Sequence, residues 1–283
     1  MPVTINFNWA PGAAPGPPEQ AAINYAGAQW EARLNENMTI NVQVWWVDMS
    51  ATGLNGLCVP GIHQTATSTL TRPQAKQAGH IPSMDPNLDL VIVIDSITPW
   101  VLGTGPLTVV FPGQYSLSTT VMHELCHGLG FLGLCNVDNV INTGTYSAAN
   151  TLVPLINGTL ALMVPLVGLP AYFNLGIGGG LMTGFGFITH FADYFEYTNG
   201  ALTKGIPADD FTAFTTANDI DIIDNHGMFI AEILTTPPFA PFTSCDHITG
   251  GVYLMLPTTV GRYFDQPDLT TLRVIETIGW TIQ

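Results

Sequence analysis

The sequence predicts an α+β fold in which helices back a twisted mixed sheet. Residues 18–36 place apolar side chains at helical spacing, residues 39–47 alternate between apolar and polar side chains, and residues 88–95 form a nearly continuous apolar run. These are the patterns of an amphipathic helix, a half-buried strand and a more deeply buried strand. At 283 residues without an evident linker, the chain suits a single domain over 18–283, preceded by a flexible arm rich in Pro and Gly at 1–17.

The first predicted helix lays one apolar stripe on the sheet. This stripe consists of Ile23, Ala26, Trp30 and Leu34. The strand after it points one set of side chains toward the core. That set consists of Ile40, Val42, Val44 and Trp46.

Residues 96–115 are rich in Gly, Pro and Thr and indicate turns with one short strand around Val109 and Val110. Ser116 or Ser118 can then cap a new helix, because a serine hydroxyl accepts a hydrogen bond from a free backbone N–H of the first turn. This second helix is expected to carry the chemistry of the protein.

The charge balance excludes one class of partner. Six Lys and Arg residues against 21 Asp and Glu give a net charge of -15, and such a surface has too few cations to bind a phosphate backbone. Residues 139–192 carry no charge at all, but Pro, Asn and Gly interrupt every window near the roughly 20 residues that a membrane span needs. We therefore expect neither a nucleic-acid partner nor a membrane span.

Four cysteines permit two disulfides, in any of three connectivities, and suit an oxidising compartment. They are Cys58, Cys126, Cys135 and Cys245. The first 20 residues lack the basic and apolar regions of a signal peptide. We expect a secreted protein whose signal peptide is absent from this sequence.

The string HELCHGLGF at 123–131 contains the pattern His-Glu-x-x-His. On a helix, His123 and His127 project from one face at the spacing of two zinc ligands, and Glu124 lies beside the metal as a general base. Gly128 and Gly130 can end the helix in a sharp turn. The pattern predicts one zinc ion and the hydrolysis of peptide bonds by an activated water.

The same string resembles the metzincin metallopeptidases, whose His-Glu-x-x-His-x-x-Gly-x-x-His pattern supplies three ligands above a methionine turn. Here Gly133 occupies the position of the third histidine, so the nearest resemblance is to leishmanolysin-like proteases, in which an inserted segment precedes a distant third histidine. That order implies His247 as the third ligand and Met255, within YLMLP at 253–257, as the methionine of the turn.

The resemblance extends to secreted bacterial metalloproteases at both ends of the chain: the segment 21–44 resembles their opening helix and strand, and the segment 268–280 resembles their closing helix. It implies a zincin-like, metzincin-like catalytic domain with an N-terminal lobe at 18–135, an insertion at 136–240 and a C-terminal lobe at 241–283. The implied activity is that of a zinc endopeptidase acting on proteins or peptides. The alternative is a secreted, non-catalytic binding or structural module stabilised by zinc.

Other residues compete for roles in this site. His190 is the main rival of His247 as third ligand, and Asp138 is a weaker one. Cys126 is expected to point away from the metal, as a disulfide partner or a buried thiol. Tyr253 and Tyr263 are candidates to stabilise an oxyanion, although tyrosines in such positions are more often structural. Histidines in turn-like contexts are further, weaker candidates; they are His63, His80 and His226.

A calcium site is a separate expectation. Asp219, Asp221 and Asp224 lie close together in the sequence and offer oxygen ligands, although their spacing does not fit an EF-hand loop. An acidic strand followed by a turn is the competing interpretation.

Overall fold

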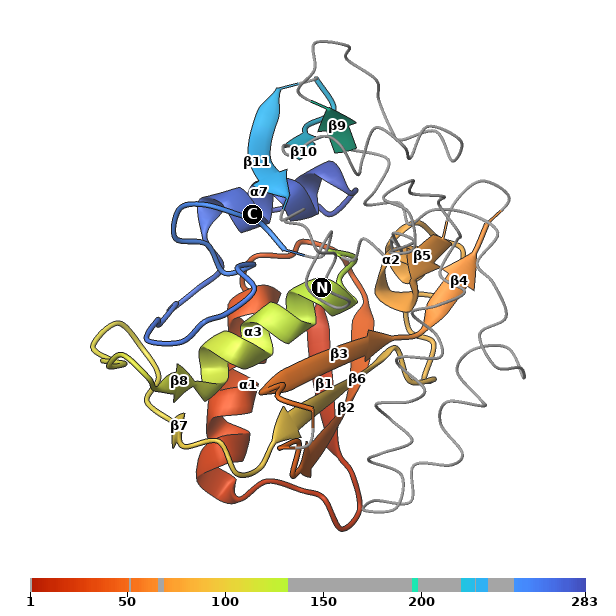
Figure 1. Ribbon diagram of the computed structural model, residues 1–283. Helices are drawn as coiled ribbons and strands as arrows, with labels where there is room; N and C mark the ends of the chain where they lie inside the picture. The colour runs from red at the N-terminus through yellow and green to blue at the C-terminus, as the bar shows by residue number, and fades with distance from the viewer. Residues whose placement is uncertain are drawn as a thin grey trace, which may run out of the picture.

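The computed structural model describes residues 2–50, 52–65, 69–131, 195–197, 220–226, 228–233 and 247–283. A four-stranded mixed sheet forms its centre (Figure 1). Its strands, in spatial order, are β1 (Thr4–Trp9), β2 (Thr39–Val47), β6 (Leu90–Asp95) and β3 (Gly56–Pro60). The first three run parallel, and β3 pairs antiparallel with β6 at the edge. The structure is thus mixed α and β, as an α+β prediction requires.

One face of the sheet carries the main core. The helices α1 (Pro17–Glu31) and α3 (Leu117–Gly128) pack side by side on it, and the indole Nε1 of Trp30 donates a hydrogen bond of 3.0 Å to the carbonyl of Met122. Alternate side chains of a strand point to the same face, and β2 supplies Val42 and Val44 to this core. The packing fixes the position of α3 above the sheet.

The opposite face of the sheet is covered as well. Trp45 and Val47 of β2 and Val91 and Val93 of β6 belong to a second buried cluster, which also contains Leu57 of β3. The strand predicted at 39–47 therefore forms at the expected position, but both of its faces contribute buried side chains, so the prediction that it is half-buried was wrong.

The C-terminal segment closes over α3. Helix α7 (Leu269–Thr277) begins at Asp268, whose carboxylate accepts the backbone N–H of Thr271 and also that of Leu254. The indole Nε1 of Trp280 donates to the carbonyl of Leu129, at the end of α3. The predicted helix near the C-terminus is confirmed, and it anchors the segment that carries His247.

Two strand pairs, a three-stranded sheet and one short helix complete the described part. The pairs are β4 (Ile62–Gln64) with β5 (Thr69–Thr71) and β7 (Trp100–Val101) with β8 (Tyr115–Ser116), the sheet has the order β11 (Phe229–Ile233), β10 (Ile220–Ile223) and β9 (Phe195–Tyr197), and the helix is α2 (Arg72–Gln77). Within the described residues, no helix combines the length and the apolar character that crossing a membrane requires.

The flexible arm predicted at 1–17 is wrong for its first half. Residues 4–9 form β1, which pairs in parallel with β2 so that Ile5 lies opposite Ile40. The backbone N–H of Ile5 also donates to the carboxylate of Glu31 at the end of α1. The run TINFNW has the polar and apolar alternation of a strand, and pairing along β2 satisfies its backbone.

Three further features differ from the prediction: the end of a helix, a short strand and the assignment of one segment. The helix expected over 18–36 ends at Glu31, because the chain must turn before it enters β2. No strand forms at Val109 and Val110 within the described loop, which is instead closed by the pairing of β7 with β8. Residues 220–233, assigned to an insertion, contribute Ile222, Ile230, Ala231 and Ile233 to the main core.

Candidate metal centre

Helix α3 presents the His-Glu-x-x-His pattern from a fully buried position. It begins at Ser116, whose hydroxyl accepts the backbone N–H of Thr119, so the first of the two predicted caps is confirmed. All twelve residues of the helix are buried. A helix whose residues are all buried has little freedom to rotate, and its polar side chains have fixed directions.

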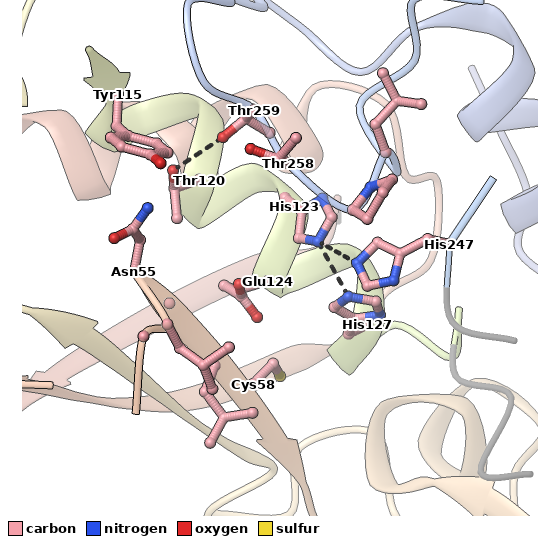
Figure 2. Close-up of a pocket in the computed structure, with 16 residues that line it drawn as sticks. Asn55, Cys58, Tyr115, Thr120, His123, Glu124, His127, His247, Thr258 and Thr259 are labelled. Carbon is pink, nitrogen blue, oxygen red and sulfur yellow. Dashed lines mark hydrogen bonds between the residues drawn. The ribbon is translucent and has the colours of Figure 1, made fainter. Parts of the chain in front are cut away.

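Three histidines converge at one point. His123 Nε2 lies 3.1 Å from His127 Nε2 and 3.1 Å from His247 Nε2, and one ligand atom from each of the three lies within 4.8 Å of the others (Figure 2). The three side chains are 5–8% exposed. The structure thus brings together the three residues that the sequence predicted as metal ligands.

The tautomers of two rings follow from their hydrogen bonds. His123 Nδ1 lies 2.8 Å from the carbonyl oxygen of Leu254, and His127 Nδ1 lies 2.7 Å from that of Phe131. A carbonyl only accepts, so each Nδ1 carries the proton and donates it. The Nε2 atoms of the neutral rings then face each other with their lone pairs.

Two lone pairs held 3.1 Å apart repel each other unless a cation lies between them. A proton is a poor candidate, since burial lowers the pKa of His123 to about 4 and burial together with the neighbouring His123 and His247 holds the pKa of His127 well below its usual value. A metal ion fits: nitrogen ligands at about 2.0–2.1 Å from zinc in tetrahedral geometry lie about 3.3 Å from one another. The residues present therefore suit a metal ion.

Glu124 lies one position along the helix from His123 and is 7% exposed. Burial raises the pKa of its carboxyl to about 8, against the opposing effect of the backbone N–H that Cys58 of β3 donates to it. Figure 2 shows the carboxylate in the same cavity as the histidine rings. The arrangement places a group that takes and returns protons beside the candidate metal position.

A cavity of about 290 Å³ opens over these groups. Its wall contains residues that the sequence did not point to, because neutral polar side chains in loops form no recognisable motif. They are Asn55, Tyr115, Thr120, Thr258 and Thr259.

Comparisons of this chain with protein-family models, with curated proteins and with solved structures find no match. The metzincin-like fold and the leishmanolysin-like relationship therefore stay predictions. The chemistry of the site has to be inferred from its geometry.

The competing histidines lie elsewhere or outside the described residues. His63 and His80 stack on each other with ring centroids 5.6 Å apart, and His226 is exposed in the turn between β10 and β11. His190 and Asp138 fall outside the described residues.

Two disulfides among the four cysteines were possible, but two of the four cysteines are not in a disulfide. Cys58 and Cys126 are buried free thiols, and Cys126 packs in the main core, as expected of a buried thiol. Burial raises the pKa of both thiols well above the usual value, so neither is reactive. Cys135 and Cys245 lie outside the described residues.

Met255 is fully buried, and its carbonyl accepts the backbone N–H of Ile248, next to His247. This packing suits the supporting role predicted for it. Tyr263 donates its hydroxyl proton to Asp265 and does not line the cavity; nor does Tyr253, which packs against the main core. The two tyrosines are therefore structural in this arrangement.

Among the described residues, neither Asp221 nor Asp224 belongs to a group of three or more side chains that could hold a metal ion. Asp224 accepts the backbone N–H groups of His226 and Met228 and pairs with Arg273, and these partners lower the pKa of its carboxyl to about 2. Asp219 lies outside the described residues. The hydrogen bonds of the turn and the ion pair with Arg273 account for the position of the Asp224 carboxylate without a bound ion.

Gly130 gives the chain the turn that returns Phe131 to His127. Its φ of 118° is one that side chains rarely adopt, and an added Cβ would lie 2.3 Å from the amide of Gln74. We expect Gly130→Ala to lower the free energy of unfolding by about 2 kcal/mol or more, measured in urea. Gly79→Ala is the matched control, because Gly79 has a φ of 78° with open space around it. Equal losses in both variants would contradict the role of the Gln74 contact.

The metal-free protein should lose stability as the pH rises from 6.5 to 8. The folded state holds the Glu124 proton up to about pH 8, whereas an unfolded glutamate has released it above about pH 4.3. The free energy of unfolding therefore falls by about 2 kcal/mol across this window. Below pH 6.5 the buried neutral histidines make the free energy of unfolding fall as the pH falls. The unfolded chain binds protons on these histidines there, whereas folded His123 stays neutral down to about pH 4.

Urea unfolding of chelator-treated protein at pH 5, 6.5 and 8 measures both effects. Glu124→Gln should remove the loss above pH 6.5 and keep the loss toward pH 5. If the variant and the parent protein lose stability equally between pH 6.5 and 8, the assignment to Glu124 is wrong.

Proposed function

We propose that this chain is a zinc-dependent endopeptidase that hydrolyses internal bonds of proteins or peptides. One observation carries the proposal: three histidine Nε2 atoms converge beside a buried glutamate at the floor of an open cavity. Three neutral nitrogen ligands with a free fourth position are typical of catalytic zinc, whereas structural zinc sites have four protein ligands. Among the described residues, the ligand cluster contains three side chains.

Zinc held in such a site would act as a Lewis acid on the substrate carbonyl and would lower the pKa of the attacking water to about 7. His123, His127 and His247 would hold the ion through Nε2, and the carbonyls of Leu254 and Phe131 keep two of these rings in the required tautomer. The carboxylate of Glu124 accepts a proton from the attacking water and then donates this proton to the leaving amine.

The position of β3 favours an extended polypeptide as substrate. This strand is the outermost one of the four-stranded sheet on the side of the cavity, and Gly56, Leu57 and Cys58 line the cavity. The backbone of an edge strand can pair with an extended chain, which would run along β3 past Glu124. A non-catalytic zinc module would need neither Glu124 nor, at the metal, a strand that is the last of its sheet among the described residues. Secretion is also part of this proposal, supported by the weakly charged composition.

Zinc content and cleavage of an unstructured protein such as casein test the function together. We expect about one zinc per chain, cleavage at internal bonds, loss of cleavage after removal of zinc by 1,10-phenanthroline, and recovery when zinc is returned. A protein that keeps one zinc per chain and cleaves no peptide bond would favour the structural module instead.

A further inference from the structure

The cavity continues past Glu124 into a recess with a neutral polar wall. We call it the hydroxyl recess and define it by Asn55, Tyr115, Thr120, Thr258 and Thr259. Figure 2 shows these side chains gathered at one end of the cavity, beyond Glu124 and opposite the end where His127 and His247 lie. Among the described residues, neither Lys nor Arg lines any part of the cavity, and Glu124 is its one acidic side chain.

Two hydroxyl residues of the recess, Thr120 and Thr259, are buried, and their hydroxyls are incompletely paired with each other. Thr120 Oγ1 lies 3.4 Å from Thr259 Oγ1, and the two residues are 5% and 7% exposed. Two hydroxyls offer two donors and four acceptor positions, and one mutual bond uses one of each. Asn55 accepts a bond from Thr98 through its Oδ1, and Figure 2 shows its amide nitrogen directed toward Thr120. The recess therefore offers both donors and acceptors to a ligand.

Glycine at position 56 lets β3 lie close against α3 at the edge of the recess. A Cβ there would lie 2.8 Å from the Glu124 carboxylate and 3.0 Å from Thr120 Cγ2. Leu57 lines the cavity beside it but packs its side chain into the cluster on the other face of the sheet. A substrate side chain that enters this part of the cavity thus meets hydroxyl groups.

We propose, on the basis of the peptidase function above, that the hydroxyl recess binds one side chain of the substrate and selects a small, uncharged, hydrogen-bonding one such as Ser, Thr or Asn. An apolar side chain of the same shape would displace water and leave buried hydroxyls without partners. A carboxylate would give up its hydration in a cavity whose described lining offers it no cationic side chain.

Fluorogenic peptides that differ at one position test this selection. Thr and Val have the same shape, as do Asn and Asp, and each pair is placed in turn at the three positions on either side of the cleaved bond. At one position we expect kcat/KM to be about tenfold higher for Thr than for Val, the effect of one unsatisfied buried hydroxyl, and at least as much higher for Asn than for Asp. Equal cleavage within both pairs at every position would overturn the proposal.

Variants of the recess locate the effect. Thr259→Val with Thr120→Val should bring the ratio of Thr to Val cleavage close to one, whereas Thr259→Ser should keep the preference because it keeps a hydroxyl. Thr281→Val, which changes an exposed threonine outside the cavity, is the matched control and should keep the full ratio. A preference that survives the double substitution would overturn the assignment to these residues.

The two proposals fail in distinguishable ways. Cleavage of all the peptides without preference would remove the selection by the recess and leave the peptidase intact. Cleavage of none of them by zinc-loaded protein would remove the proposed function and the selection with it.

Discussion

Glu124→Gln is expected to lower kcat for peptide hydrolysis by a factor of about 10²–10⁴ while zinc stays bound. Glutamine keeps the shape of the side chain but can neither take the proton of the water nor return it to the leaving amine, and general acid and base catalysis contributes about this much. The three imidazoles are untouched, so the zinc content measured by atomic absorption should equal that of the parent protein.

Glu276→Gln is the matched control, because Glu276 is exposed on α7, outside the cavity. It should retain the parent activity. Parent-like hydrolysis by Glu124→Gln with zinc in place would rule out Glu124 as the base. Loss of zinc from Glu124→Gln would assign the carboxylate to the metal rather than to the water.

His247→Ala is expected to weaken zinc binding by about 100-fold or more and to abolish hydrolysis. Loss of a group that only orients a ligand already costs about 10–100-fold in metal affinity, and His247 lies in the cluster itself, with its Nε2 at 3.1 Å from that of His123. Competition with a chromogenic chelator measures the affinity. This substitution tests the residue that is farthest from the motif in sequence.

His226→Ala provides the control, since His226 is exposed in the turn between β10 and β11. It should bind zinc as tightly as the parent protein. If His247→Ala also bound zinc with parent affinity, the third ligand would have to come from another residue.

The helix and its ligand pair were predictable because their signals are local. A spacing of four residues places His123 and His127 on one face whatever the rest of the fold does, and Ser116 at the start of the helix acts through its own first turn. The deeply buried β6 was predictable for the same reason, since its apolar run has few alternatives.

Features that depend on distant partners were harder to predict. The alternation in TINFNW is the signal that reveals β1, but the Pro and Gly that follow it favoured an arm, and only pairing with β2 decides between the two. His247 was inferred from a resemblance rather than from spacing, because it lies far from His123 and His127 in the sequence. No local pattern identifies a ligand that only the folded chain brings to the helix.

The cavity wall shows the same limit. Asn55, Tyr115 and Thr259 come from three separate segments, and neutral polar side chains are common in loops, so nothing in the sequence marks them as neighbours. Their proximity follows from the packing of β3, β8 and the C-terminal segment around α3.

Anomalous scattering from crystals of the zinc-loaded protein, recorded on both sides of the zinc absorption edge, tests the metal centre most directly. We expect one peak about 2.0–2.1 Å from the Nε2 atoms of His123, His127 and His247, with Glu124 beside it and not bound to it. A peak at other residues, or none in protein saturated with zinc, would contradict the proposed centre.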